Sequence, residues 1–247
     1  MNRPTLLCLA GVVWWVAPCA AGADIVSFVA SRDNTLYQSA SGAVSNGVGP
    51  GFTTGTNSQG GIRRALIAFD IASNVPAGAT IQNVSLQLHL SRTVSGAADV
   101  SLFRALADWG EGTSNAGSND GQGAPATPGD ATWIHRFYNT VFWTNAGGDF
   151  AGGASGSASV DQVEFYTWSS AAMATDVQSW LDAPAAAFGW GVLIDGASPG
   201  TTKRFDSREA ADPTLRPVLT VTYAVPGPGG AVVLAGVAAL FARRGRK

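Results

Sequence analysis

The residues best suited to binding chemistry lie in a glycine-rich stretch between Ala107 and Ala158. Binding sites for small polar ligands combine aromatic rings with a few well-placed polar groups, and sugars in particular stack on exposed rings. This stretch contains both kinds of group. The glycan-binding residues predicted from it are Trp109, Trp133, His135, Arg136, Tyr138 and Trp143, with Asn139 beside them. The alternative is structural, because buried rings would fold the stretch onto the rest of the protein.

Oxygen ligands for a metal occur in the same stretch, at Asn119, Asp120, Gln122 and Asp130. Hard ligands on a flexible loop suit Ca²⁺ better than Zn²⁺. We therefore predict a calcium site formed by Asn119, Asp120 and Asp130. The spacing lacks the ordered carboxylate pattern of an EF-hand loop, so an ordinary Asn-Asp-Gly turn is the alternative.

Two residue groups could support catalysis, and neither forms a motif. Glycoside hydrolysis needs two carboxylates across a cleft, for which Asp108 and Glu111 are the available pair. Lyase chemistry needs a base beside an arginine, and His135, Arg136 and Tyr138 supply those types. All five have ordinary roles in loops. We therefore assign no catalytic residue and expect a protein that is not an enzyme.

These residues must be positioned by β-strands. Between residues 81 and 90 the apolar residues occupy alternate positions, which predicts a strand with one buried side. The residues on that side are Val84, Leu86, Leu88 and Leu90. Further strands are expected at 188–194 and near Arg64, Val100, Phe165 and Val221.

One helix is expected before Pro184, with Ser169 or Ser170 as its N-cap. The residues that would form its apolar face are Met173, Val177, Trp180 and Leu181. The composition, with 31 glycines and 13% charged residues, favours many short strands elsewhere. We therefore predict an all-β fold, a jelly-roll-like antiparallel β-sandwich with one short helix and a long aromatic-rich insertion.

The charge distribution argues against nucleic acid as a partner. Five of the 15 basic residues lie in the terminal segments, so a net charge of about −7 remains between Asp24 and Ala224. Arg63 and Arg64 should lie on opposite faces of one strand. The segment from Lys203 to Arg216 alternates in sign, which is typical of a surface ion-pair network that orders a turn before the last strand.

The N-terminus has the order of a secretory signal, because an arginine precedes an apolar run that ends in small residues. We place the cleavage site after Ala23. Cys19 offers a lipoprotein alternative, which Pro18 directly before it disfavours. Cys8 and Cys19 would both leave with the signal, so the mature domain would hold no thiol for a disulfide or a metal.

The C-terminus combines an apolar run with a basic end. From Gly229 to Ala242 there are 14 small or apolar residues, which as a helix span ~21 Å of a ~30 Å hydrocarbon core. Counted from Val225, the segment is just long enough to cross. Basic residues after such a run hold its end on the cytoplasmic side, so the domain before it would stay outside. The alternative is a short helix packed on the domain.

This C-terminal segment resembles the PEP-CTERM sorting signal of Gram-negative bacteria, which has a Pro-x-Pro motif, an apolar run and a terminal arginine cluster. The resemblance implies that the sorting residues are Pro226, Pro228, Arg243 and Arg244. It also implies attachment to the inner membrane and an exosortase-type partner that removes the signal. Gly227 departs from the glutamate usual at that position, which bears on the cleavage step.

Most of residues 33–223 resembles the DNRLRE family of bacterial and archaeal surface proteins, which are β-sandwich modules related to carbohydrate-binding modules. The resemblance rests on the strings DNTLY, RRALIAFDI with VPAGATI, DWGEGTSN, GAPATPGDATW, YTWSS with VQSWL, and KRFDSREAADPTLRPVLTVTY. It implies a jelly-roll-like sandwich on a secreted or surface protein, with sugar binding in some relatives.

The sequence thus predicts three segments: a signal peptide at 1–23, a β-sandwich domain at 24–224 and a sorting segment at 225–247. The expected protein is exported to the cell envelope, cell surface or extracellular matrix, where it binds polysaccharide without catalysis. A structural surface protein without sugar specificity is the alternative. A polysaccharide lyase or glycoside hydrolase is a third class.

Overall fold

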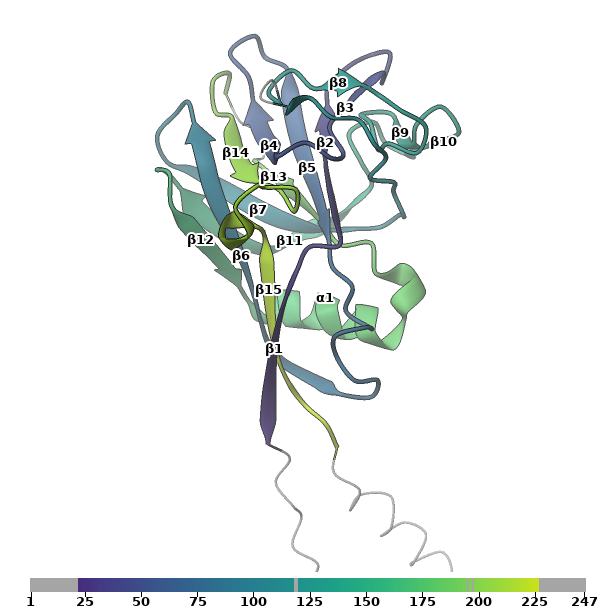
Figure 1. The fold of residues 1–247 in the computed structure, drawn as a ribbon, viewed down its shortest axis with the longest axis vertical. Helices are drawn as coiled ribbons and strands as arrows, with labels where there is room; N and C mark the ends of the chain where they lie inside the picture. Colours follow the sequence, from purple (N-terminus) through teal and green to yellow (C-terminus); the bar gives the residue numbers. More distant parts are fainter. Residues whose placement is uncertain (1–21, 118–119, 195, 197, 227–247) are drawn as a thin grey trace, which may run out of the picture. The chain divides into compact units, whose positions relative to one another are not determined.

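Figure 1 shows the fold in a computed structural model, which describes residues 22–117, 120–194, 196 and 198–226. Nearly all of the predicted signal peptide lies outside these residues, as do Asn119, Pro228, Arg243 and Arg244. Residues Ala23–Val225 form one compact unit. Within the described ranges, no helix has the length and apolar character needed to span a membrane.

The protein has an all-β, antiparallel, sandwich-like fold. Eleven strands of the described residues form one curled sheet, whose two halves face each other. The first half consists of β1 (Ala23–Val29), β15 (Val218–Ala224), β6 (Thr80–Thr93) and β12 (Phe165–Ser169). The second half consists of β2 (Arg32–Tyr37), β5 (Ile62–Ala68), β13 (Trp190–Leu193), β7 (Ala98–Ala105) and β11 (Phe150–Val160).

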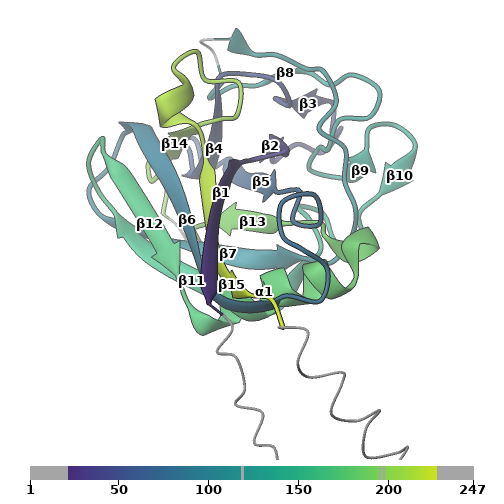
Figure 2. The same cartoon turned by 60° about the horizontal axis from the view of Figure 1, so that its bottom comes forward.

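The two halves are joined through β14 (Lys203–Asp206), which pairs with β6, and β4 (Gly51–Thr56), which pairs with both β14 and β5. Two short ribbons lie outside this sheet. They are β3 (Val44–Ser45) with β8 (Ala124–Pro125), and β9 (His135–Phe137) with β10 (Val141–Phe142). In Figure 2 the strands β6 and β12 lie on the left, and both ribbons lie at the upper right.

The main core fills the space between the halves, and it confirms the predicted face of β6. The side chains of Val84, Leu86, Leu88 and Leu90 are fully buried, because alternate residues of a strand point to one face of its sheet. The strands expected near Arg64, Val100, Phe165 and Val221 are β5, β7, β12 and β15. The strand expected at 188–194 is confirmed in its centre, as β13.

The predicted helix is α1 (Ala171–Asp182), which closes one end of the main core. Its N-cap is Ser170, whose Oγ accepts a hydrogen bond from the backbone N–H of Met173 at 3.0 Å. All four residues of the predicted apolar face are buried. The indole of Trp180 contacts that of Trp190 on β13 edge to face, with ring centroids 4.6 Å apart. Two single-turn 3₁₀ helices lie at Pro184–Ala186 and Pro213–Leu215.

The predicted insertion, however, ends earlier than expected. Residues Phe150–Val160 are not part of a loop, because they form β11 and pair with β7 along the edge of the sheet. Their glycine, alanine and serine side chains give little strand signal, and the neighbouring strand supplies the hydrogen bonds that keep them extended. The insertion is therefore residues 106–149.

The charged segment before the last strand also differs from its prediction. Its first residues form β14 rather than a turn, and Lys203 is fully buried. Arg204 and Arg208 reach acidic residues of the insertion, so the network is not confined to the surface.

Arg63 and Arg64 of β5 point to opposite faces of the strand, as predicted. Arg63 contacts the ring of Tyr37, and Arg64 contacts the ring of Trp133.

Candidate functional site

The three tryptophans predicted to bind glycan are buried. Trp109, Trp133 and Trp143 expose 0%, 9% and 6% of their surfaces. They form a satellite core with Leu36, Leu66 and Ala68, on the face of β5 opposite to the main core, together with Ala131. The prediction that these indoles form an exposed glycan-binding surface is therefore wrong. Their burial agrees with the structural alternative. The physical reason is that the outer face of β5 is itself apolar and needs a cover.

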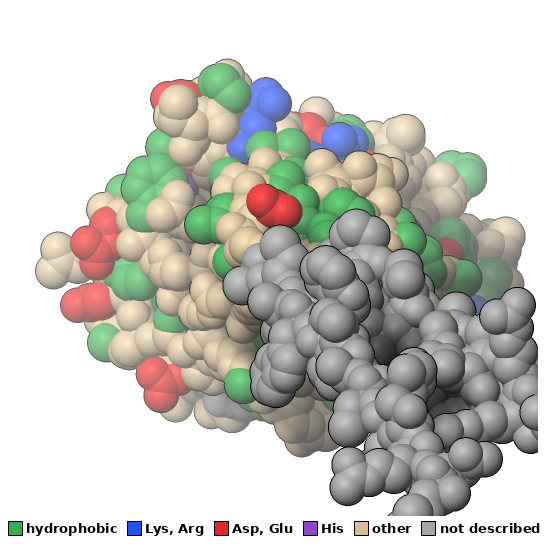
Figure 3. All heavy atoms as spheres, turned by 90° about the horizontal axis from the view of Figure 1, so that it is seen from below, with side chains coloured by type: hydrophobic (Ala, Val, Ile, Leu, Met, Phe, Trp, Pro, Cys, Tyr) green, Lys and Arg blue, Asp and Glu red, His purple; other side chains and the backbone are tan. Residues whose placement is uncertain are grey.

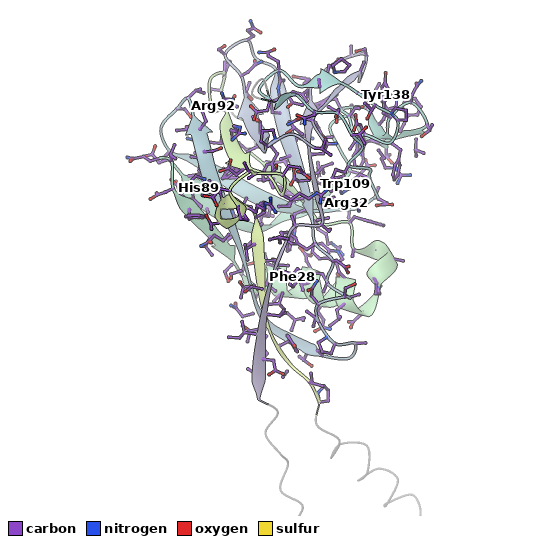
Figure 4. All side chains as sticks on the ribbon, in the orientation of Figure 1. Phe28, Arg32, His89, Arg92, Trp109 and Tyr138 are labelled. Atoms are coloured by element: carbon purple, nitrogen blue, oxygen red, sulfur yellow. The ribbon has the colours of Figure 1, made fainter. Side chains whose placement is uncertain are left out.

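Trp109 packs in this apolar core and also has polar partners. Its Nε1–H donates to the carbonyl of Phe188 at 2.8 Å. The guanidinium of Arg32 on β2 lies over the indole, 4.4 Å from the ring centroid. Figure 4 labels the two residues next to each other. Arg32 also pairs with Asp108 at 2.8 Å and donates to the Trp109 carbonyl. These contacts tie the start of the insertion to β2.

Trp133 and Trp143 tie down the rest of the insertion. Arg64 lies 5.3 Å from the Trp133 ring centroid and donates to the carbonyl of Gly147 at 2.9 Å. The Nε1–H of Trp143 donates to the carbonyl of Thr132 at 2.9 Å. Because a buried indole N–H needs an acceptor, this bond fixes the orientation of the Trp143 ring. The satellite core therefore forms a rigid support for whatever the insertion exposes.

The insertion exposes the hairpin formed by β9 and β10. The backbone of Asn139 at its tip has a φ of 61°, a left-handed conformation that asparagine adopts more readily than most residues. Phe142 is 61% exposed and Val141 37% exposed, and Tyr138 is half-buried. We call Tyr138, Val141 and Phe142 the hairpin surface.

The hairpin surface rests on His135, a predicted site residue that is itself buried. The ring centroids of His135 and Phe142 are 4.6 Å apart, and that of Tyr138 lies edge-on to the imidazole at 5.3 Å. The imidazole Nδ1 lies 3.0 Å from Thr132 Oγ1. Burial lowers the pKa of His135, so the imidazole is neutral at pH 7. Its role here is to support two rings rather than to carry charge.

Arg136 connects the hairpin to the start of the insertion. Its Nη1–H donates to the carbonyl of Asp108 at 3.0 Å, and its Nε–H lies 3.4 Å from the carbonyl of Phe142. The side chain thus bridges β10 and the segment that carries Trp109. Of the predicted site residues, His135 contacts Tyr138, while Arg136 reaches the hairpin at the carbonyl of Phe142.

The predicted calcium ligands have other partners. Asp120 is buried, and its carboxylate binds Arg92 at 2.9 Å and also binds Arg204. Two guanidinium groups at one carboxylate repel a calcium ion. The carboxylate of Asp130 accepts hydrogen bonds from Thr127 and Ser114, and burial raises its pKa. These contacts do not support the predicted site, and Gln122 is exposed.

Among the described residues, no group of three or more His, Cys, Asp or Glu side chains is arranged to hold a metal ion. Three acidic residues of the insertion, Asp108, Glu111 and Asp120, each pair with an arginine instead. On the face seen from below in Figure 3, most acidic side chains drawn in colour stand apart from one another. The charged groups of the site are thus engaged mainly in holding the insertion.

The acids considered for hydrolysis are likewise engaged in ion pairs. Asp108 is bound by Arg32, while Glu111 receives Arg208 through two hydrogen bonds of 2.8 and 2.9 Å. Glu111 also accepts the backbone N–H of Asp33 at 2.9 Å. Such contacts join β2, the insertion and the segment after β14.

The carboxyl of Asp33 lies at the centre of this junction and is almost fully buried. It accepts the backbone N–H of Arg208 at 2.9 Å. Burial raises the pKa of Asp33 well above its usual range, and the nearby charges of Glu209 and Glu111 raise it further. Burial also raises the pKa of Glu209. The surroundings of Asp33 and Glu209 therefore favour the protonated, uncharged form of each carboxyl.

Beyond the hairpin surface, the chain lines a shallow hollow of about 320 Å³ with Leu106, Phe150 and Asn145. Leu106 is 51% exposed. Asp149 at the rim accepts the backbone N–H groups of Thr144 and Asn145, which lower its pKa despite partial burial. Leu106 and Phe150 thus give the hollow apolar lining, and Asn145 gives it an amide group.

Sequence reasoning missed two residues of the site. Phe142 is not among the residues that the sequence assigns to binding, although the short pattern HRF-YNT-VF indicates a hairpin. Arg32 lies 77 positions before Trp109, and no local pattern joins the two. Only the pairing of β2 with β5 brings Arg32 to the insertion.

Comparison with known proteins adds no family to this description, because no protein-family model matches the chain and no curated protein matches its sequence.

Proposed function

We propose that the protein is a non-catalytic polysaccharide-binding module of the cell envelope or extracellular matrix, and that it binds through the hairpin surface. The observation that carries this proposal is the exposed ring of Phe142, supported from behind by the buried His135 and flanked by Tyr138. A ring held in one place loses little conformational entropy when a sugar stacks on it.

The polar groups around the rings favour a sugar over an apolar partner. The guanidinium of Arg136 lies beside the hairpin, and Asn139 and Thr140 are exposed at its tip. Planar guanidinium and amide groups suit the hydroxyl pairs of a pyranose. Export and retention by the C-terminal sorting segment, with an exosortase-type partner, belong to the same proposal.

The proposal is tested with affinity gels and a glycan array, using the full chain with and without Ca²⁺. The variant Tyr138→Ala/Phe142→Ala should lose retardation by the polysaccharide that retards the wild type. The matched control is Phe165→Ala, since Phe165 is 45% exposed on β12 in the other half of the sheet. Absence of binding across neutral and acidic polysaccharides would contradict the proposal.

A structural surface protein without sugar specificity is the second candidate. The burial of Trp109, Trp133 and Trp143 favours it, because an aromatic-rich insertion then needs no ligand to explain its composition. Equal retardation of the wild type and the double variant on every gel would favour this second candidate.

A further inference from the structure

Lys203 is buried completely, which is rare for a lysine. The chain has two lysines, Lys203 and Lys247, and all its other basic residues are arginines. At position 203 the chain therefore has a lysine, with its ammonium group, rather than the arginine that it has at most of its basic positions. Burying a charged group is costly unless its surroundings replace the lost water.

The ammonium of Lys203 lies in a cage of oxygen atoms. Its Nζ is 2.7 Å from Thr93 Oγ1, 2.7 Å from the carbonyl of Gly96 and 3.1 Å from the carbonyl of Ser95. A fourth oxygen, the carbonyl of Asp161, lies at 3.5 Å. The three nearest oxygens match the three N–H groups of an ammonium, which has no acceptor of its own.

These oxygens come from two turns that are far apart in the chain. Thr93, Ser95 and Gly96 belong to the end of β6 and the turn before β7. Asp161 follows β11, in the turn before β12. One cation therefore holds together two turns at the same end of the sandwich, and β14 delivers it from between β6 and β4.

The cage selects a compact cation. A guanidinium is a flat fork that needs acceptors spread in one plane, whereas an ammonium is a small centre with three rotatable donors. A neutral amine has only two N–H groups and could not donate to all three near oxygens at once. Burial lowers the pKa of Lys203, and the negative charge of Asp161 opposes that change.

We propose that these oxygens form a monovalent-cation site, and that the ammonium group of Lys203 is the cation bound there. The ammonium of Lys203 donates to these oxygens as a bound ammonium ion would. When the side chain is removed, the site binds a free primary alkylammonium ion. The fold thereby joins two turns through a cation without depending on the supply of an ion from outside.

The proposal is tested by rescue of Lys203→Ala with n-propylammonium, which replaces the three carbons and the nitrogen that the substitution removes. In the full chain this variant should lower Tm by about 10 °C, because it removes the cation that joins the two turns and leaves a cavity in its place. Propylammonium chloride should then restore several degrees more than tetramethylammonium chloride at the same concentration, because tetramethylammonium has no N–H to donate. Equal effects of the two salts would overturn the proposal.

Lys203→Met is the matched control, because its side chain fills the channel but carries no ammonium. Its Tm should fall as well, and propylammonium should restore no more of it than tetramethylammonium does. Selective rescue of Lys203→Met would contradict the site, since no space is left there for the ion.

A second measurement needs only the wild type. In the native full chain an amine-acetylating reagent should modify Lys203 at least about tenfold more slowly than it modifies the same lysine in urea. Peptide mass spectrometry follows the modification of Lys203 in both conditions. Equal rates in the native protein and in urea would overturn the proposal, whatever the stability of the variants.

Discussion

The two apolar cores of this protein are built from different kinds of sequence. The main core takes alternate residues from regular strands, such as Leu86 and Leu88 of β6. The satellite core takes Trp109, Trp133 and Trp143 from an insertion with no hydrophobic period. Burial is nearly complete in both. The comparison teaches that a cluster of aromatic residues in a glycine-rich stretch can indicate a core as well as a binding surface.

The cores also differ in what holds their elements together. Ladders of backbone hydrogen bonds run around the main core, from β1 to β11. The satellite core depends more on bonds between side chains and backbone, such as those from the indoles of Trp109 and Trp143. Breaking a few side-chain contacts should therefore release the insertion while the sandwich stays folded.

The largest effect is expected from Trp168→Ala in the main core. Trp168 is fully buried between the two halves of the sheet, and its Nε1–H donates to the carbonyl of Val100 at 2.7 Å. The substitution should lower the free energy of unfolding by about 4 kcal/mol, through the cavity and the unpaired carbonyl. Urea unfolding followed by circular dichroism measures this. Phe165→Ala on the same strand is the exposed control, and a similar loss in both would contradict the assigned faces.

Trp133→Ala should have a slightly smaller and more local effect. The satellite core would lose one of its three indoles and the contact with Arg64, at a cost of about 3 kcal/mol. Hydrogen exchange should accelerate in residues 106–149, with α1 and β6 still protected. Equal acceleration in all three regions would show that the two cores unfold as one unit.

Asp33→Asn tests the junction between β2, the insertion and the segment after β14. Because the folded-state pKa of Asp33 is raised, its proton stabilises the fold below the unfolded pKa of about 3.9, and this stabilisation is lost as pH rises through the folded pKa. Asparagine keeps the acceptor for the Arg208 N–H without the charge. Stability relative to wild type should therefore increase from pH 4 to pH 8, as urea unfolding would measure. A difference that does not change with pH would contradict a raised pKa.

The smallest effect is expected at the hairpin tip. Asn139→Ala should cost about 1 kcal/mol, because alanine tolerates a φ of 61° poorly. Asn139→Gly should change stability by only a few tenths of a kcal/mol. Thermal unfolding of the two variants separates backbone strain from side-chain loss. Equal destabilisation by both would mean that the asparagine amide is what matters.

Regular elements could be predicted from local sequence. The period of two in β6 and the helical spacing of Met173, Val177 and Trp180 both place apolar groups on one side, whatever the rest of the chain does. β11 could not be predicted in the same way. Its small side chains carry no period, and only pairing with β7 makes it a strand.

The candidate site was predictable in part for the same reason. Residues close in sequence, such as His135, Arg136 and Tyr138, remain close in space on a hairpin. Their exposure was not predictable, because it depends on what packs behind them. The apolar outer face of β5, with Leu66 and Ala68, buries the tryptophans and leaves the hairpin rings at the surface.

By itself, the sequence determined the all-β class, the buried face of β6, and the helix with a serine N-cap at 169 or 170. Each of these depends on interactions within a few residues. Only the tertiary structure decided that the indoles lie in a second core and that Lys203 is enclosed by oxygens from two distant turns. Contacts between distant segments depend on strand pairing, and local periodicity carries no record of which strands will pair.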